Sequence, residues 1–350
     1  MIAAAYTQGQ GLSIAEAPRP SIGIDELLVR VRAAAICGTD VKTVRNGGRR
    51  LKPGQSIVLG HEFAGTLEEA GAAVTGFAAG ERVGVAPNFG CGQCAACVRG
   101  LANMCPDYSA FGIDMDGAHA AFVRIPAAAI RQGNVTRLPS GVSWDEAALA
   151  EPLSCVLNAQ RGARLAAGET VLVYGVGPMG LLHVLLALAS GAARVLAVDT
   201  NGARLAKASE LGAECVINGA SESVPERVRA ATGGRGVNVA VVAAPVPSIV
   251  PEALTLLAPF GRLCLFAGLP GGQSVLGLDA NLIHYRNLVV TGTTGGCNAD
   301  YRAAIEMIAA RRVDVRPIIS HRFPMSGLRE AYDVALAGKG LKIVVEGEDH

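Results

Sequence analysis

The sequence has few aromatic residues, little charge, and no uninterrupted apolar run that could cross a membrane. Aromatic residues make up 4% and charged residues 17% of the 350 positions, and the formal net charge is only +1. Because no broad field of one sign exists, the composition argues against recruitment by nucleic acid or by an anionic membrane surface. The most apolar stretch, residues 171–198, is interrupted by glycines, a proline, a histidine and an arginine, which excludes a membrane-spanning helix.

Signs of secretion are also missing. Residues 1–8 lack the basic head and the apolar core of a signal peptide. The nine cysteines are an odd number, and five of them are scattered: Cys37, Cys155, Cys215, Cys264 and Cys297. This usage is typical of a reducing compartment and not of a disulfide-stapled secreted scaffold. We therefore expect a soluble, cytoplasmic protein.

The length predicts two domains, because 350 residues exceed one ordinary hydrophobic core. Residues up to about 145 contain short alternating strands between glycines and prolines, as in 27–33, 65–68 and 82–85, which indicates a mostly β, barrel-like domain. From residue 169 onward, strands at 170–174, 194–198, 215–217, 237–243 and 262–267 alternate with helices at 178–190 and 202–211. This alternation predicts a parallel sheet covered by helices on both faces. Beyond residue 290, we expect a helix at 301–310 and a terminal strand at 342–345.

Four cysteines gather within one short segment: Cys91, Cys94, Cys97 and Cys105. Two-residue gaps let three thiolates surround one ion, and a seven-residue return supplies the fourth ligand of a tetrahedron. The spacing predicts a closed structural zinc site, and the alternative, a pair of disulfides, conflicts with the reducing composition. No basic stripe flanks the cluster, which argues against a nucleic-acid-binding zinc module.

A glycine loop follows the strand at 170–174 and opens the next helix, in the order Gly175, Gly177, Pro178, Met179 and Gly180. This context predicts a dinucleotide site whose pyrophosphate lies against the helix N-terminus. Asp199 ends the following strand, where a carboxylate accepts hydrogen bonds from a ribose diol and repels a 2′-phosphate. We therefore expect NAD in preference to NADP, with Arg204 near the adenine or ribose or, alternatively, solvated.

A second set of metal-binding residue types is dispersed along the first domain. Cys37 begins the run Cys37-Gly38-Thr39-Asp40, and His61 with Glu62 follows Gly60. Cysteine, histidine and glutamate are suitable zinc ligands when the fold gathers three or four of them. From the spacing alone, the alternative to a zinc site is that these side chains only pack in the protein interior.

In order and spacing, these motifs resemble those of the zinc-dependent medium-chain dehydrogenase/reductase family over essentially the whole chain. The residues Cys37, Thr39 and Asp40 with Glu151-Pro152-Leu153 are similar to the polyol (sorbitol-like) and threonine dehydrogenase branch. The resemblance implies an α/β protein with an N-terminal GroES-like β-barrel catalytic domain and a doubly wound Rossmann domain. It places the catalytic domain at 1–148 and 287–350 and the NAD-binding domain at 149–286.

The resemblance also implies a catalytic zinc held by Cys37, His61 and Glu62, with Glu151 as a further ligand or linked through water. Asp40 would orient His61 and can cap a helix at the same time. Thr39 would pass on the substrate proton. Relatives often continue this relay through a histidine at the position where Lys42 stands here, so the role of Lys42 stays open.

Two zinc ions and NAD are the cofactors expected, and Gly268 and Thr293 complete the cofactor-contacting set that the resemblance implies. The expected reaction converts a secondary alcohol, such as a polyol or sugar alcohol, to a ketone. A threonine dehydrogenase-like activity, a sugar-alcohol-phosphate dehydrogenase and a non-catalytic NAD-binding redox sensor are the alternatives. Basic residues after the first ligand would contact a substrate phosphate or form a solvated turn: Arg45, Arg49, Arg50 and Lys52.

By resemblance, the chain should form a homodimer or homotetramer. The candidate segments for pairing between subunits are 288–291 and 263–269. Cys155 and Asn158 follow Glu151 on an expected helix, where Asn158 would contact cofactor or substrate or only pack within the helix.

Overall fold

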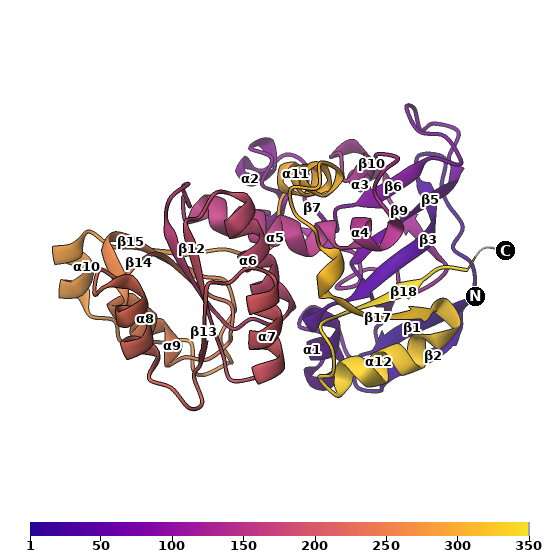
Figure 1. Cartoon of the computed structure of the whole chain (residues 1–350). Helices are drawn as coiled ribbons and strands as arrows, with labels where there is room; N and C mark the ends of the chain where they lie inside the picture. Colours follow the sequence, from indigo (N-terminus) through magenta and orange to yellow (C-terminus); the bar gives the residue numbers. More distant parts are fainter. Residues whose placement is uncertain (349–350) are drawn as a thin grey trace. The chain divides into compact units, whose positions relative to one another are not determined.

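The computed structural model describes residues 1–348 and divides into two compact units (Figure 1). Unit 1 comprises residues 1–154 and the C-terminal residues from 295 onward, and unit 2 comprises residues 155–294. The division expected from the sequence was at 148/149 and 286/287, whereas the compact units meet at 154/155 and 294/295. Each unit has its own apolar core. Within residues 1–348, no helix is both long enough and apolar enough to span a bilayer.

Unit 1 consists mainly of antiparallel strands. Its strands are β1 (Ile2–Thr7), β2 (Gly11–Glu16), β3 (Leu27–Ile36), β4 (Ser56–Val58), β5 (Glu62–Ala70), β6 (Arg82–Val85), β7 (Asn88–Phe89), β8 (Ser109–Ala110), β9 (Phe122–Ile125), β10 (Val135–Arg137), β17 (Ile319–Pro324) and β18 (Lys342–Glu346). The largest sheet has the order β10-β6-β5-β3-β18-β17, and β9 also pairs with β3. A second sheet has the order β2-β1-β4, and β7 pairs with β8.

Short helices connect and cover these sheets. They are α1 (Gly38–Asn46), α2 (Ala95–Val98), α3 (Ala127–Arg131), α4 (Trp144–Ala148), α11 (Asn298–Ala309) and α12 (Leu328–Leu336), with 3-10 turns at Ala102–Met104, Arg316–Ile318 and Met325–Gly327. Helix α5 (Ala150–Gly162) carries the chain from unit 1 into unit 2. Helix α12 packs on β17 and β18 and buries Leu328, Ala331 and Tyr332 in the unit 1 core (Figure 1).

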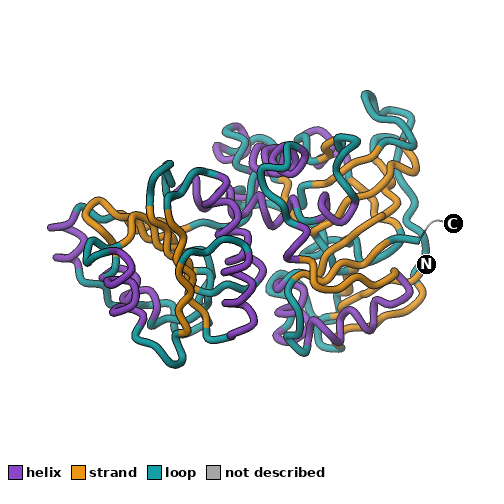
Figure 2. Tube along the Cα trace, in the orientation of Figure 1, coloured by secondary structure: helices purple, strands orange, loops and turns teal. Residues whose placement is uncertain are grey.

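Unit 2 is a six-stranded parallel sheet of the order β13-β12-β11-β14-β15-β16. Its strands are β11 (Thr170–Tyr174), β12 (Arg194–Asp199), β13 (Cys215–Asn218), β14 (Val237–Val242), β15 (Leu257–Leu265) and β16 (Val289–Gly292). Its helices are α6 (Pro178–Ala189), α7 (Gly202–Glu210), α8 (Val224–Thr232), α9 (Ile249–Thr255) and α10 (Ala280–Arg286). Figure 2 shows the strands of this unit as one twisted layer with helices on either side.

The expected βαβ series is confirmed, although some strand boundaries differ. Strand β15 begins at Leu257, five residues before the expected start, because β14 continues to pair with it there. The proposal that residues 263–269 pair between subunits is wrong for the strand part of that segment. Strand β15 already pairs with β14 on one side and β16 on the other, so its backbone groups have partners. Strand β16 ends the sheet order and keeps one free edge among the described residues.

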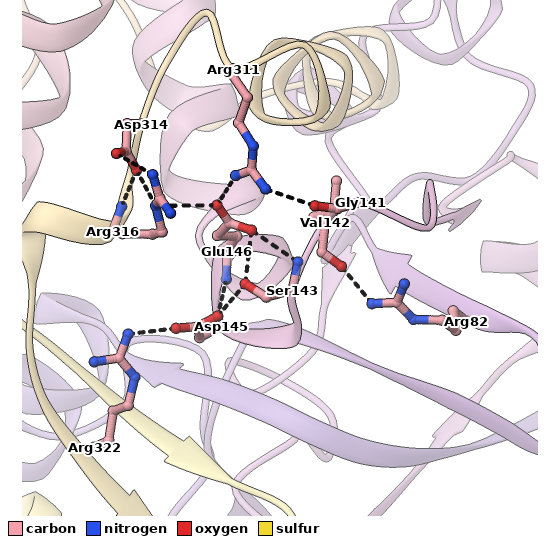
Figure 3. Close-up of polar contacts among 10 residues, drawn as sticks. All are labelled: Arg82, Gly141, Val142, Ser143, Asp145, Glu146, Arg311, Asp314, Arg316 and Arg322. Atoms are coloured by element: carbon pink, nitrogen blue, oxygen red, sulfur yellow. Dashed lines mark hydrogen bonds and ion pairs between the residues drawn. The ribbon is translucent and has the colours of Figure 1, made fainter.

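A polar network ties the C-terminal part of unit 1 to α4 (Figure 3). The carboxylate of Glu146 is buried and is approached by the guanidinium groups of Arg311 and Arg316. Arg322 donates to Asp145 over 2.6 Å. Burial favours the neutral form of Asp145, but hydrogen bonds from Ser143 and Arg322 outweigh it and lower the pKa of this carboxyl. The network holds in place the segment that leads to β17 and β18.

Candidate active site

The register of three strands brings the dispersed metal-binding residues together. Strand β3 leads directly to Cys37, and Glu62 begins β5, where it lies opposite Ala35 of β3. On the other side of β3, Val344 of β18 also lies opposite Ala35. Because side chains two residues apart in a strand share a face, Cys37, Glu62 and Lys342 project from the same face of the sheet.

Cys37, His61 and Glu62 form one compact group. One ligand atom from each lies within 4.8 Å of the others, and His61 and Glu62 are buried. Gly60 directly precedes His61 and Glu62 and has φ +95°, and a Cβ at this position would come within 2.5 Å of the His119 ring. Only glycine therefore permits the sharp turn that delivers His61 and Glu62 to the start of β5.

Asp40 caps a helix as expected, and its carboxylate also lies near His61. Its Oδ2 accepts a hydrogen bond from the backbone N–H of Cys37 over 2.8 Å, as part of a capping box at the start of α1. Its Oδ1 lies 3.7 Å from Nδ1 of His61, which has no hydrogen-bond partner among the described residues. Burial disfavours the charged imidazole, but the negative charges of Cys37, Asp40 and Glu151 outweigh it and raise the pKa of His61.

This donor set fits a zinc ion. A thiolate, an imidazole and a carboxylate are the ligand types of open zinc sites, and three protein ligands leave a position for a small molecule. The negative surroundings that would draw a proton onto His61 would equally favour a divalent cation.

Glu151 lies outside the group of mutually close ligand atoms, although its charge acts on His61, Lys342 and Tyr301. It is on the first turn of α5 and is nearly buried. Tyr301 of α11 is also buried, and burial followed by the charge of Glu151 raises the pKa of its hydroxyl. The carboxylate of Glu151 thus belongs to the same buried, negatively charged region of unit 1.

Lys342 is a residue of this site that sequence reasoning missed. Its ammonium group donates to both carboxylate oxygens of Glu62, and both side chains are at most 3% exposed. Burial would lower the pKa of Lys342, but the nearby charges of Glu62 and Cys37 outweigh it and raise that pKa. The only signal in the sequence was a lysine at the start of an apolar strand, Lys342-Ile343-Val344-Val345.

The four-cysteine lobe also fits zinc. Cys91, Cys94, Cys97 and Cys105 form a compact group, and Sγ of Cys94 lies 3.7 Å from Sγ of Cys105. All four are free thiols. Backbone N–H groups of Gln93 and Cys94 lower the pKa of Cys91 to about 7, whereas desolvation raises the pKa of Cys97 to about 12. Cys91 therefore forms a thiolate more readily than Cys97, and a bound cation would favour the thiolate form of its ligands.

In unit 2, the expected dinucleotide residues lie at the carboxyl edge of the sheet. The chain order reverses between β11 and β14, which is where open α/β sheets form their ligand crevice. A Cβ at Gly180 would lie 1.9 Å from the carbonyl oxygen of Gly175, so this glycine lets α6 approach β11. A Cβ at Gly177 would meet only the guanidinium of Arg204, at 3.9 Å, which leaves room for a pyrophosphate.

Backbone amides fix the Asp199 carboxylate. Its Oδ2 accepts from the N–H of Val176 over 2.8 Å, and its Oδ1 accepts from Thr200 and Asn201. These three bonds connect the end of β12 to the glycine loop and leave about one acceptor position of the carboxylate open, on Oδ2. Gly268 and Thr293 follow β15 and β16 at the same edge. The hydroxyl of Thr293 accepts from Asn158 over 3.0 Å, so the Asn158 amide is engaged within unit 2.

Several other candidate residues are exposed or have structural partners. Thr39 and Lys42 are exposed on α1. Arg45 donates to the carbonyl of Leu336, and Arg50 pairs with Asp114 over 2.8 Å. Arg45, on the last turn of α1, and Arg50 therefore have structural contacts. The exposed Arg49 and Lys52 have no side-chain partner among the described residues.

Comparisons with known proteins agree with this geometry. Residues 23–137 match the family model of the alcohol dehydrogenase GroES-like domain, and residues 178–310 match that of zinc-binding dehydrogenases. Sorbitol dehydrogenase of Bacillus subtilis is 33% identical over 352 residues, covering 99% of this chain and 97% of the relative. L-Threonine 3-dehydrogenase of Pyrococcus furiosus is 33% identical over 340 residues, covering 95% and 94%.

Solved structures of dehydrogenases are also similar to this chain. A zinc-binding dehydrogenase from Sinorhizobium meliloti, bound to NADP, superposes with a TM-score of 0.88 at 30% identity and covers 99% of this chain and 98% of its own. An alcohol dehydrogenase from Escherichia coli complexed with NADH has a TM-score of 0.88 at 28% identity, with 99% coverage of both chains. Galactitol-1-phosphate dehydrogenase from E. coli has a TM-score of 0.88 at 26% identity and covers 99% and 100%.

Proposed function

The chain belongs to the zinc-dependent medium-chain dehydrogenases of the polyol and threonine branch, and we propose that it oxidises a secondary alcohol of the polyol type to a ketone with NAD. The observation that carries this proposal is the group of Cys37, His61 and Glu62, placed together by strand register in unit 1. Unit 2 supplies a dinucleotide edge of the Rossmann type.

The protein residues have separable tasks in this proposal. Cys37 and His61 hold a zinc ion, which when bound supplies Lewis-acid chemistry that lowers the pKa of an alcohol hydroxyl. Asp40 fixes the ring of His61 from behind, since its carboxylate faces Nδ1. Glu62 completes the ligand set, and Glu151 adds negative charge to the buried region. The hydroxyl of Thr39, two residues after Cys37, passes the substrate proton towards solvent because it is exposed.

NAD is the proposed cofactor, and the glycine loop with Asp199 supports it. The backbone amides that fix the Asp199 carboxylate leave an acceptor position on Oδ2 for a ribose hydroxyl, and its charge opposes a 2′-phosphate. Arg204 beside Gly177 supplies positive charge for the pyrophosphate. The NADP-bound relative makes NADP the alternative to test.

Three substrate classes remain in competition. Sorbitol dehydrogenase and threonine dehydrogenase relatives are equally similar to the chain, and a sugar-alcohol-phosphate enzyme shares its fold. We favour an unphosphorylated polyol, because Arg45 and Arg50 already have structural partners. A phosphorylated substrate would have to rely on the exposed Arg49 and Lys52.

We further propose that the protein is cytoplasmic and forms a homodimer or homotetramer in which the free edge of β16 pairs with a second copy. Its cysteines are free thiols, and the exposed apolar residues of unit 2 include Phe260, Val275, Tyr285 and Val289, the last of them on β16 itself. An edge strand with exposed apolar side chains is a ready site for pairing with a second copy.

The decisive experiment combines metal analysis with a substrate panel. The purified protein should contain two zinc ions per chain and reduce NAD with polyols faster than with L-threonine, simple alcohols or sugar-alcohol phosphates. Faster turnover with L-threonine or with a phosphate would assign the corresponding alternative. One zinc per chain, unchanged in Cys37→Ser, together with no turnover, would instead favour a non-catalytic NAD-binding sensor.

A further inference from the structure

The side chain of His119 lies between the two backbone segments that carry the expected metal ligands. It is fully buried, and its Nε2 lies 3.3 Å from the carbonyl oxygen of Ala35, two residues before Cys37. The ring also packs against Gly60, directly before His61, since a Cβ on that glycine would lie 2.5 Å from Cδ2 of the imidazole. One ring therefore contacts both the end of β3 and the turn that leads into β5.

The backbone around His119 holds the same turn. The N–H of His119 donates to the carbonyl of Leu59 over 2.8 Å, and the N–H of Ala118 donates to the carbonyl of Gly60 over 2.9 Å. The carbonyl of His119 accepts from the N–H of Ala4 on β1, also over 2.9 Å. Because these three bonds anchor the residue, its ring has a defined place between the two ligand-carrying segments.

Tyr332 of α12 is the second partner of the His119 ring. Its hydroxyl oxygen lies 2.6 Å from Nδ1 of the imidazole, although the two residues are 213 positions apart in the sequence. The rings pack edge to face with their centroids 5.5 Å apart, and Tyr332 is fully buried. The C-terminal helix of unit 1 thus reaches the metal-binding region through this one contact with His119.

The two contacts of the ring define which nitrogen carries the proton. A carbonyl oxygen only accepts, so Nε2–H donates to Ala35. Burial outweighs the charge of Asp40 and lowers the pKa of His119, which keeps the ring neutral and leaves Nδ1 as an acceptor. Burial, followed by the charges of Asp40 and Cys37, raises the pKa of Tyr332, so its hydroxyl stays protonated and donates to Nδ1. With both nitrogens engaged, the ring is suited to holding backbone segments and not to moving a substrate proton.

We propose that His119 is a positioning residue that sets the separation of Cys37 and His61, and that Tyr332 holds it in the tautomer this role requires. The Nε2–H group ties the end of β3 to the ring, and the face of the ring limits the turn before His61. Without these contacts the two segments can shift independently, so the thiolate and the imidazole bind a metal ion less tightly and in less regular geometry. This inference rests on the proposed catalytic zinc site.

Three variants and one control remove parts of this arrangement. His119→Phe keeps an aromatic ring but loses both hydrogen bonds and leaves the Tyr332 hydroxyl buried without its acceptor. The double variant H119F/Y332F removes that hydroxyl as well. His119→Gln keeps an N–H donor for the carbonyl of Ala35. Tyr6→Phe is the matched control, because Tyr6 is a buried tyrosine of β1 in the same apolar core.

The first measurement is metal binding, independent of turnover. Protein that retains its four-cysteine zinc is titrated at the second site with Zn²⁺ against a chromophoric chelator, and with Co²⁺ followed by the d–d absorption band. We expect H119F and H119F/Y332F to bind either ion about 10-fold more weakly than the parent, with a shifted cobalt band, because outer groups that orient ligands have effects of this size. H119Q should stay within about 3-fold of the parent, since it keeps the donor to Ala35. Y6F should match the parent.

Thermal unfolding of the same proteins separates positioning from a general loss of stability. H119F/Y332F should unfold at a higher temperature than H119F, because no buried hydroxyl is left without an acceptor. Its metal affinity should nevertheless stay as low as that of H119F. Recovery of affinity together with stability, or parental affinity in H119F, overturns the inference. If H119F does not fold, equal affinities of H119Q and H119F/Y332F would overturn it instead.

The tautomer of His119 is measured without any metal at the second site. In ¹⁵N NMR of histidine-labelled protein, the signals of His119 are identified by their absence from H119Q. They should show a neutral ring with the proton on Nε2. A proton on Nδ1 would contradict the inference, because Nε2 could then not donate to Ala35.

Failure of the inference and failure of the proposed function are distinguishable. If the parent binds no second metal ion and Cys37→Ser equals the parent, the proposed catalytic site is wrong, whatever the tautomer of His119. If the parent binds two metal ions and H119F behaves like Y6F, only the positioning role of His119 is wrong.

Discussion

Acid should destabilise unit 2 through His183, which lies on α6 behind the glycine loop. The imidazole is fully buried, and its ring packs edge-on against Phe266 with the centroids 4.6 Å apart. Its Nδ1 lies 3.4 Å from Nε2 of Gln160, and its Nε2 has no partner among the described residues. Because burial penalises the charged ring and no carboxylate offsets it, the pKa of His183 falls to about 3.

The sign of the effect follows from proton linkage. A histidine in the unfolded chain titrates near 6.5, so below that pH the unfolded state binds a proton that the folded state does not. Stability is therefore complete above pH 6.5 and is lost as the pH falls towards 3. At pH 5, about 1.5 pH units below the unfolded pKa, the loss is about 2 kcal/mol at 1.36 kcal/mol per unit. This value is insensitive to the folded pKa, which lies well below 5.

The assay compares the parent with His183→Leu by urea unfolding at pH 7.5 and pH 5. Backbone circular dichroism is the suitable signal, because the single tryptophan, Trp144, lies in unit 1 and does not report on α6. Between the two pH values the parent should lose about 2 kcal/mol more than the variant, by the same linkage. His284→Leu, at an exposed position of the same unit, should retain the parent's loss. Equal losses in parent and His183→Leu would refute the reasoning.

Three further predictions concern the two zinc sites and the cofactor loop. Cys94→Ser should lower the zinc content by one ion per chain and reduce the thermal unfolding temperature. His61→Ala should remove the other zinc ion and lower kcat/KM by at least roughly 1,000-fold in a protein that still folds. Parental turnover in His61→Ala would contradict the proposed catalytic site. Asp40→Asn should weaken metal binding at the second site by about 10- to 100-fold in chelator competition, because the amide no longer supports His61 as a carboxylate does; unchanged affinity would show that the 3.7 Å approach is incidental. Gly180→Ala should abolish NAD binding in calorimetry, because its Cβ would lie 1.9 Å from a backbone oxygen, whereas Gly202→Ala, with open space around it, should bind normally.

Local motifs could be interpreted from the sequence because their members lie close together in the chain. Short turns bring the four cysteines of one lobe together, and the strand before the glycine loop and the helix after it indicate a dinucleotide site. The βαβ alternation likewise predicted the parallel sheet, since each strand and helix carries its own periodicity. Strand ends were less predictable, as the early start of β15 shows, because pairing with a neighbour extends a strand beyond its apolar residues.

The group of Cys37, His61 and Glu62 was accessible to sequence reasoning only through family resemblance. The spacing between residues 37 and 61 does not predict that the end of β3 lies beside the start of β5. Asp40 was easier, because a capping position and support for a ligand require the same residue in the same place. For Asn158, the sequence left two interpretations open, and its contact with Thr293 depends on how α5 lies against the end of β16.

By itself, the sequence determined the local motifs, and these predict thiolates for a structural ion, a glycine loop for a pyrophosphate, and an acidic strand end for a ribose. Only the tertiary structure decided which distant groups share one buried space. Lys342 shows the reason, because strand register across β5, β3 and β18 converts a separation of 280 residues into a direct ion pair. A charge that is expensive to bury is tolerated there because the fold supplies its partner, and no local pattern in the chain encodes that partner.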